Sequence, residues 1–215
     1  MVGEGVLHQA LKHPEVELVL VIGRRPCGVA HPKLKEVIHN DFLDYSSIEK
    51  QLEGYNACYF CLGVSSVGMN EKDYARLTYD LTMEAAKTLA ELNPDMTFCY
   101  VSGAGTNENG RLMWQRVKGK TEADLTKLPF KNVYLFRPGF IKPIKGLKRA
   151  YRGANLLGLL YSILEFFFRK HVCKLEDVGL AMISVTKNGP DAKIIDSQDM
   201  AALANGWEKQ ALLRK

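Results

Sequence analysis

Three side chains in one short region have types and a spacing that suit chemistry on a bound molecule. Ser102 ends a strand-like run, and Trp114 and Lys118 follow in a segment with a helical pattern. A serine hydroxyl and a lysine ammonium can hold oxygen atoms, whereas an indole N–H donates a hydrogen bond but does not titrate near neutral pH. Proton transfer lacks an obvious group, because no His lies between 40 and 170 and Tyr100 lies inside the strand.

Short buried strands that alternate with helices must position these residues. The continuous apolar runs occupy residues 16–23, 34–41, 56–63, 96–103 and 132–139. The clearest helical pattern spans 73–92 and stops at Asn93-Pro94, as a helix end should. Continuous apolar strands separated by helices predict a parallel sheet covered on both faces. The fold class is therefore α/β, with a doubly wound parallel sheet that binds ligands at the carboxyl ends of its strands.

The residues directly after these runs are small, polar or basic. Arg24 and Arg25 follow the first run, where dinucleotide-binding sheets usually carry a carboxylate for the ribose 2′-hydroxyl. A guanidinium suits a 2′-phosphate instead, and an ordinary surface pair of arginines is the alternative. Asp41 and Phe42 follow the second run and could flank an adenine. Gly63 follows the third run, where small residues let a ligand approach the backbone.

Length and charge set the broad class of protein. The chain has 215 residues, enough for one domain with its own core and no need of a metal or disulfide. Its 29 basic and 24 acidic residues give a formal net charge of +5. This excess is mild, and the sequence shows no stripe of aromatic and basic residues that could stack bases, so nucleic acid is not an expected partner.

The five cysteines favour a reducing compartment, because they are odd in number and most lie in apolar segments. Cys58 and Cys61 form a C-x-x-C motif, but inside a buried strand this spacing places the two side chains on opposite faces. We therefore expect neither a redox pair nor a metal site there. The start, MVGEGVLHQALKH, lacks the pattern of a secretory signal, and a cytoplasmic location is expected.

The order and spacing of several short motifs resemble those of short-chain dehydrogenases/reductases. The similarity is to the extended or atypical, epimerase-like type related to the Tat-interacting-protein oxidoreductases. The matching strings are VIGRRP, DF at 41–42, FCLGVSS, YVSGAG, VKGKTE, FRPGF and LEDVGLAM at 175–182. The match as a whole runs from about residue 1 to residue 187. The resemblance implies a Rossmann fold that binds NADP(H) across the strand ends.

The resemblance also implies which residues hold this cofactor. They are Gly3, Arg24, Arg25, Asp41, Phe42, Leu62, Gly63, Lys118, Pro138 and Gly139. In this assignment the arginine pair holds the 2′-phosphate and the Asp-Phe pair holds the adenine. Gly63, next to Leu62, lies under the pyrophosphate or ribose. Lys118 binds the nicotinamide ribose, and the Pro-Gly pair borders the nicotinamide.

The chain departs from this family at its start. The family opens with a strand and a G-x-x-G-x-x-G turn, whereas this chain begins MVGEGVLHQAL, so Gly3 matches only the last glycine. The turn matters because its glycines let backbone N–H groups reach the phosphates at a helix N-terminus. We therefore expect an N-terminally shortened core with an unpaired slot in its sheet. We interpret Met1 as an internal or miscalled start, and a genuinely shortened fold is the alternative.

The second departure is Trp114. In the family, a Tyr four residues before the Lys gives or takes the substrate proton, a Ser holds the substrate oxygen and the cofactor carries the hydride. Ser102 and Lys118 keep their register here, and Trp114 occupies the Tyr position. The indole could cover a nicotinamide or sugar face, or it could simply pack.

Residues 1–145 are expected to form the Rossmann core, and residues 146–215 a C-terminal helical region that covers the substrate. The apolar stretch 156–168 is shorter than the about 20 residues that a spanning helix needs. Basic residues flank it, so 146–171 could lie on a membrane surface, but a cover over the cleft or a homodimer contact is favoured. A helix closed by Gly189, a short strand in AKIIDS and a final turn through 205 should follow.

Two functions of different classes remain open. The first is an NADP(H)-dependent oxidoreductase or epimerase-like enzyme that acts on a small carbonyl or sugar-like substrate, supported by Ser102 and Lys118. The second is a catalytically impaired protein that senses NADP(H) or has a regulatory role, supported by Trp114. The fold does not decide between them.

Overall fold

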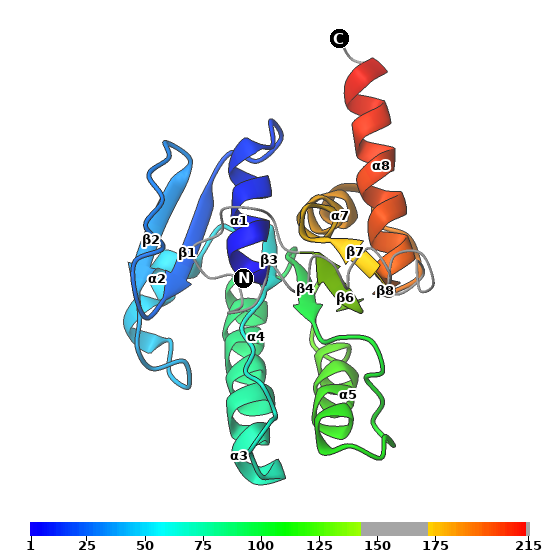
Figure 1. The fold of residues 1–215 in the computed structure, drawn as a ribbon. Helices are drawn as coiled ribbons and strands as arrows, with labels where there is room; N and C mark the ends of the chain where they lie inside the picture. Colours follow the sequence, from blue (N-terminus) through cyan, green and yellow to red (C-terminus); the bar gives the residue numbers. More distant parts are fainter. Residues whose placement is uncertain (143–171, 214–215) are drawn as a thin grey trace. The chain divides into compact units, whose positions relative to one another are not determined.

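The computed structural model describes residues 1–142 and 172–213 (Figure 1). Its residues form two compact units. The first unit comprises Met1–Asn40 together with the described residues from Pro138 onward, and the second comprises Asp41–Arg137. The predicted boundary at 145/146, the predicted apolar helix at 156–168 and its basic flanks lie outside the described residues.

A parallel sheet is the core of the second unit. Its strands, in spatial order, are β3 (Ala57–Phe60), β4 (Thr97–Val101) and β5 (Asn132–Arg137). Along β4 the first four residues are all buried, although successive side chains point to opposite faces of a sheet. Both faces of β4 are therefore covered, as the continuous apolar run in the sequence predicts.

Helices precede and connect these strands. They are η1 (Ser46–Ile48), α2 (Glu49–Leu52), α3 (Glu71–Ala75), the π-helical turn η2 (Arg76–Asp80), α4 (Leu81–Leu92) and α5 (Met113–Leu125). The elements α3, η2 and α4 follow one another directly between β3 and β4 (Figure 1). This run confirms the helix predicted at 73–92. The π-helical turn inside it was not predicted.

Asn93 ends this helical run and ties it to the segment before β3. Its side-chain Oδ1 accepts hydrogen bonds from the N–H groups of Gly54 and Tyr55, at 2.8 and 3.1 Å. Its Nδ2 donates to the carbonyl of Leu52 at 3.0 Å. The predicted helix stop at Asn93-Pro94 is confirmed, and it also anchors the turn that leads into β3.

The first unit contains two pairs of parallel strands, one further strand and three helices among its described residues. They are α1 (Val2–Lys12), β1 (Val19–Gly23), β2 (Leu34–Ile38), β6 (Phe140–Lys142), β7 (Val172–Lys174), α7 (Leu175–Asn188), β8 (Ile194–Asp196) and α8 (Ser197–Leu213). Strand β1 pairs with β2, and β6 pairs with β7. The helix closed by Gly189 and the strand in AKIIDS are confirmed. The final turn predicted through 205 is instead a helix that continues to Leu213.

Helix α1 packs on α7 through glycines. A Cβ atom added to Gly5 would lie 2.3 Å from Cγ of Leu175, and one added to Gly179 would lie 2.9 Å from Cβ of Gln9. The two helices therefore approach more closely than larger residues would allow. Gly3, by contrast, is exposed in the first turn of α1.

Within the described part of the chain, β1 and β2 pair only with each other, and β3 pairs only with β4. Each of these three strands therefore keeps one open edge. The unpaired slot that the sequence predicts in the sheet stays a prediction. Across residues 1–142 and 172–213, no helix has the length and apolar character needed to cross a bilayer.

We expect Asn93→Ala to lower the free energy of unfolding by about 2–4 kcal/mol, because it leaves the buried carbonyl of Leu52 and the N–H groups of Gly54 and Tyr55 without these partners. Urea unfolding followed by circular dichroism measures the change. Asn109→Ala is the matched control, since Asn109 is an exposed loop residue, and it should change stability by less than about 0.5 kcal/mol. Equal stabilities of the two variants would contradict the anchoring role of Asn93.

Candidate active site at the end of strand β4

A glycine-containing loop leads from β4 into α5 and begins at Ser102. Gly103 and Gly105 have φ angles of 133° and 86°, which residues with a side chain rarely adopt. The far end of the loop is tied to the first turn of α5 by Gln115. Its Oε1 accepts from the N–H of Leu112 at 3.0 Å, and its Nε2 donates to the carbonyl of Gly105 at 2.9 Å.

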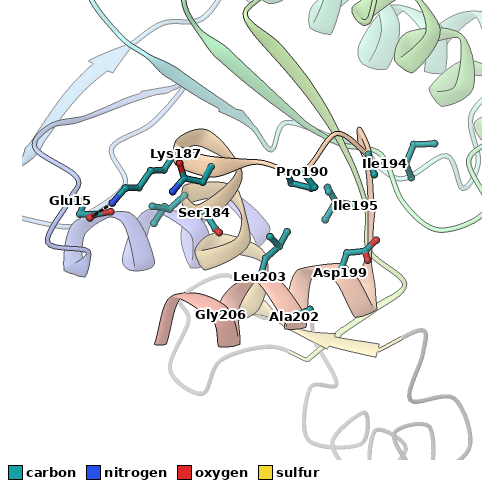
Figure 2. Close-up of a pocket in the computed structure, with 13 residues that line it drawn as sticks. Glu15, Ser184, Lys187, Pro190, Ile194, Ile195, Asp199, Ala202, Leu203 and Gly206 are labelled. Carbon is teal, nitrogen blue, oxygen red and sulfur yellow. Dashed lines mark hydrogen bonds and ion pairs between the residues drawn. The ribbon is translucent and has the colours of Figure 1, made fainter. Parts of the chain in front are cut away.

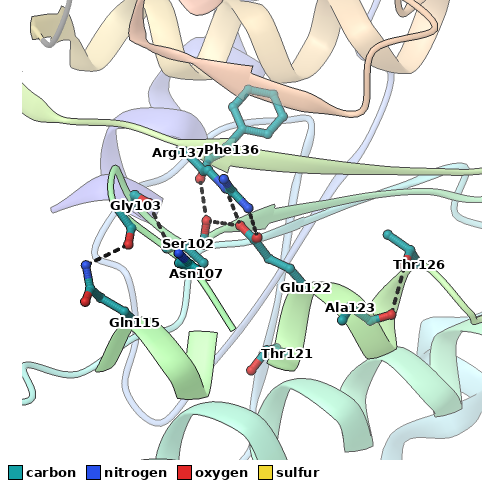
Figure 3. Close-up of polar contacts among 12 residues, drawn as sticks. Ser102, Gly103, Asn107, Gln115, Thr121, Glu122, Ala123, Thr126, Phe136 and Arg137 are labelled. Atoms are coloured by element: carbon teal, nitrogen blue, oxygen red, sulfur yellow. Dashed lines mark hydrogen bonds and ion pairs between the residues drawn. The ribbon is translucent and has the colours of Figure 1, made fainter. Parts of the chain in front are cut away.

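The side chain of Ser102 belongs to a buried polar network. Its Oγ lies 2.5 Å from Oε1 of Glu122 and 3.3 Å from the carbonyl oxygen of Phe136 (Figure 3). Ser102 is 4% exposed and Glu122 is 3% exposed. The single hydroxyl proton is therefore directed at the Glu122 carboxylate. To hold a substrate oxygen, as the family resemblance implies, Ser102 would have to give up this hydrogen bond.

Arg137, the last residue of β5, completes the network. Its Nε donates to Oε1 of Glu122 at 3.0 Å, and its Nη2 forms a short contact with Oε2 of the same carboxylate. The guanidinium thus binds both oxygens, which is the strong, planar form of this ion pair. Through Glu122, helix α5 is bound to the ends of both β4 and β5.

Lys118 lies on α5 one turn before Glu122 and reaches the same strand end. Its Nζ donates to the backbone carbonyl of Ser102. Burial lowers the pKa of Lys118 below its usual value, and the negative charge of Glu122 acts in the opposite direction. The structure therefore brings together Ser102 and Lys118, the two predicted catalytic residues that the sequence keeps in register.

Gly119 allows α5 to lie against the loop that precedes it. A Cβ atom at this position would lie 2.2 Å from the backbone N of Glu108 and 2.6 Å from the backbone C of Asn107. No side chain fits in this space. The position of Lys118, the preceding residue, therefore depends on glycine at 119.

Trp114 lies on the first turn of α5 and is half-buried. A Cβ atom added to Gly105 would lie 3.4 Å from its Cη2 atom, so the edge of the indole borders the glycine loop. This placement is compatible with either interpretation of Trp114, a cover for a ligand ring or simple packing.

The predicted cofactor residues of the second unit lie at strand ends or in loops. Leu62 and Gly63 follow β3, which pairs in parallel with β4, so these residues lie at the same sheet edge as Ser102. Gly63 is exposed, and a Cβ atom there would meet nothing within 4 Å. Asp41 is exposed, and its Oδ1 accepts from the N–H of Leu43. Phe42 packs edge-to-face on Tyr45, with ring centroids 6.1 Å apart.

The remaining predicted residues belong to the first unit. Arg24 and Arg25 follow β1 and are exposed. Pro138 is buried, and the N–H of Gly139 donates to Oγ of Ser197 at 3.0 Å. This amide is therefore already engaged within its own unit.

A hollow of about 440 Å³ lies in the first unit, along α7 and α8 (Figure 2). Its walls are largely apolar, with Ile183, Ile195 and Leu203 among them. Two of its charged residues are paired, since Lys187 binds Glu15. We therefore place the candidate active site at β4, where a lysine and an open glycine lie at one sheet edge.

Groups for metal or thiol chemistry are scarce in the described part of the chain. There, no three His, Cys, Asp or Glu side chains gather in a way that could hold a metal ion. Cys58 and Cys61 are free thiols. Burial raises the pKa of the neighbouring Cys99 well above its usual value.

Sequence reasoning missed Glu122 and gave Arg137 no role. Glu122 ends the VKGKTE string, one helical turn after Lys118, and Arg137 begins the RPG turn. The helical spacing indicates that Glu122 shares a face with Lys118. Only the structure shows that this face meets the ends of two strands.

Several curated relatives of this chain are fungal proteins named mitochondrial. No family model matches the chain. It is 27% identical to "Protein FMP52, mitochondrial" of Debaryomyces hansenii over 65% of this chain and 62% of that protein. It is 26% identical to the protein of the same name from Saccharomyces cerevisiae, over 97% of this chain and 94% of that protein. The first of these matches covers less than two thirds of the relative's length.

These names contradict the predicted cytoplasmic location. Relatives from several fungi are named mitochondrial proteins. The prediction from cysteine usage was wrong because free thiols report a reducing environment and do not say which compartment provides it.

Several solved structures similar to this chain are epimerases. WbmF of Bordetella bronchiseptica, solved in complex with NAD+, has a TM-score of 0.62 at 14% identity and covers 95% of this chain and 73% of its own. ADP-L-glycero-D-manno-heptose-6-epimerase of Helicobacter pylori has a TM-score of 0.64 at 16% identity, over 92% and 72% of the two chains. The chain therefore has the parallel-sheet Rossmann fold of the epimerase-like short-chain dehydrogenases/reductases, as the motifs predict.

Gly119→Ala should lower the free energy of unfolding by about 1–3 kcal/mol, because the added methyl group forces α5 away from the backbone at Asn107 and Glu108. Thermal and urea unfolding measure the loss. Gly63→Ala is the control, since its Cβ atom enters open space, and it should stay within about 0.5 kcal/mol of the parent. A neutral Gly119→Ala would show that the helix and loop do not pack as described.

Proposed function

We propose that this chain binds NADP(H) and acts as an oxidoreductase or epimerase-like enzyme on a small carbonyl or sugar-like substrate. One observation carries the proposal: Lys118 is held at the end of β4, at the sheet edge where the exposed Gly63 follows the neighbouring strand β3. Ligands of open α/β sheets bind at this edge. Two similar structures, WbmF and WbmG, were solved with NAD+ and NAD.

The described residues fit the nicotinamide-ribose half of such a cofactor. Lys118 provides a cation for the ribose hydroxyls, and Gly63 leaves space for a ligand against its backbone. When bound, the nicotinamide supplies or takes the hydride. For the pyrophosphate, the described residues offer only Gly3, in the first turn of α1, in place of a glycine-rich turn.

The preference for NADP(H) over NAD(H) rests on Arg24 and Arg25. Both are exposed directly after β1, where a carboxylate would hold the ribose 2′-hydroxyl of NAD. A guanidinium there forms charge-assisted hydrogen bonds with a 2′-phosphate. Asp41, Phe42, Leu62, Pro138 and Gly139 keep the roles that the family resemblance implies, as parts of the same proposal.

A second candidate function is that of an NADP(H)-sensing or regulatory protein, and Trp114 favours it. The indole cannot exchange a proton with a substrate at neutral pH.

A homodimer and a peripheral membrane contact through 146–171 also remain proposals, and that segment lies outside the described residues.

NADPH should quench the emission of Trp114 in a Trp207→Phe background, which leaves Trp114 as the only tryptophan. Replacing both Arg24 and Arg25 by Ala should weaken NADPH binding about 10- to 100-fold and leave NADH binding nearly unchanged, since hydrogen bonds to charged groups contribute about 1.5–3 kcal/mol. Arg76→Ala, an exposed arginine of the π-helical turn, is the control. Equal losses for NADPH and NADH would overturn the 2′-phosphate assignment, and no quenching by either cofactor would overturn the proposed function.

Trp114→Tyr separates the enzyme from the sensor. We expect the parent chain to oxidise NADPH slowly with a carbonyl substrate, and the variant to do so about 10²–10⁴-fold faster, because a phenol four residues before Lys118 restores a general acid. NADPH consumption across a panel of small aldehydes, ketones and keto-sugars measures the gain. Trp114→Phe is the control and should gain nothing. Turnover by the variant alone, with an inactive parent, would support the sensor.

A further inference from the structure

Glu122 lies where three elements of the second unit meet. It is on α5, it binds Arg137 at the end of β5 through both carboxylate oxygens, and it accepts a hydrogen bond from the Ser102 hydroxyl after β4. Figure 3 shows these contacts converging on one carboxylate. Ser102 in turn accepts a hydrogen bond from Lys118 at its backbone carbonyl. One residue, Ser102, therefore connects the Glu122 carboxylate to the Lys118 ammonium.

Stability alone does not account for this arrangement. A buried ion pair rarely stabilises a fold more than apolar residues of similar size, because both ions lose their hydration. What the pair does provide is geometry, since a planar guanidinium and a bidentate carboxylate fix each other's orientation. Here the pair fixes the geometry of the turn at Ser102, whose backbone carbonyl accepts a hydrogen bond from Lys118.

We propose that Glu122 is a positioning residue for Lys118: with Arg137 as its counter-ion, it orients Ser102 so that the Ser102 carbonyl holds the Lys118 ammonium at the end of β4. In this role Ser102 binds Glu122 and Lys118 of helix α5 and does not act directly on the substrate. The inference deepens the proposed function and rests on it only for the consequence, which is cofactor binding by Lys118.

The charged and titratable groups around Lys118 are consistent with this role. Glu122 on α5 is the anion that opposes the effect of burial on the pKa of Lys118. Arg137 on β5 faces Glu122 from the other side. Tyr100 on β4 lies near Glu122, and burial raises its pKa, so it stays neutral. Removal of the Glu122 charge therefore removes an anion that keeps Lys118 protonated.

The test is Glu122→Gln in the full chain, with the pKa of Lys118 measured by the pH dependence of lysine labelling and mass spectrometry. We expect the pKa of Lys118 to fall by on the order of one unit. Asp124→Asn is the matched control, because Asp124 is on the same helix and pairs with the exposed Lys120 and Lys127. It should leave Lys118 unchanged. An unchanged pKa of Lys118 in folded Glu122→Gln overturns the proposal.

Glu122→Gln leaves Arg137 without its carboxylate partner. A second variant therefore covers the case in which Glu122→Gln does not fold. Glu122→Leu combined with Arg137→Met removes both charges and keeps the volume, a change that buried pairs usually tolerate. We expect this double variant to fold and to show faster labelling of Lys118, because Ser102 is no longer oriented to hold the ammonium. The fall in the pKa of Lys118 should be smaller than in Glu122→Gln, since the Arg137 cation is lost together with the Glu122 anion. A folded double variant in which Lys118 is labelled and titrates as in the parent overturns the proposal.

The pH profile of NADPH affinity connects the inference to function. In Glu122→Gln, the pH above which affinity declines should move down together with the pKa of Lys118. A merely structural role would weaken binding equally at every pH. If the labelling shifts but neither parent nor variant binds NADPH, Glu122 still positions Lys118 and the proposed function fails. If NADPH binds and the profile does not move, the positioning role fails.

Discussion

The ion pair between Glu122 and Arg137 constrains the arrangement of the strand ends in the second unit. A charged carboxylate that is 3% exposed needs partners, and removal of one partner of such a pair costs roughly 3–5 kcal/mol. Arg137 supplies the counter-charge from β5, and Ser102 supplies a hydrogen bond from β4. These requirements can be met only when α5 is docked at one rotation about its axis. That rotation also places Lys118, one turn earlier, against the same strand end.

Two further features fix α5 along its length. Gln115 bonds the first turn to the preceding loop, and Gly119 admits the backbone of that loop where any side chain would collide with it. The helix is therefore held by a bond at its start, a close backbone contact in the middle and an ion pair near its end. Because α5 is held at three points, a substitution at one exposed or half-buried position does not shift the helix. Trp114 occupies such a position.

The sequence predicts the parts of this structure that depend on local pattern. Continuous apolar runs give buried parallel strands, and Asn93 followed by Pro94 stops a helix. In both cases the cause lies within a few neighbouring residues. The pairing of Glu122 with Arg137 joins residues on different elements, and no local pattern distinguishes it from a surface charge. The same limit explains why Ser102 could be placed at a strand end but not recognised as a hydroxyl already bound to Glu122. The cytoplasmic prediction failed for another reason, since cysteine usage carries no information about which reducing compartment holds a protein.

The arrangement around α5 also bears on the choice between enzyme and sensor. Lys118 is connected to the buried Ser102 and Glu122. This network places a cation at a sheet edge whether or not a proton is transferred nearby. Proton transfer depends on the residue at 114, and the network around Glu122 does not include that residue. A scaffold of this kind keeps its ligand geometry when the acid is lost, which is how one fold can hold both active and inactive members. The identity of residue 114 is therefore decisive for chemistry, whereas Glu122 is decisive for the geometry that either function requires.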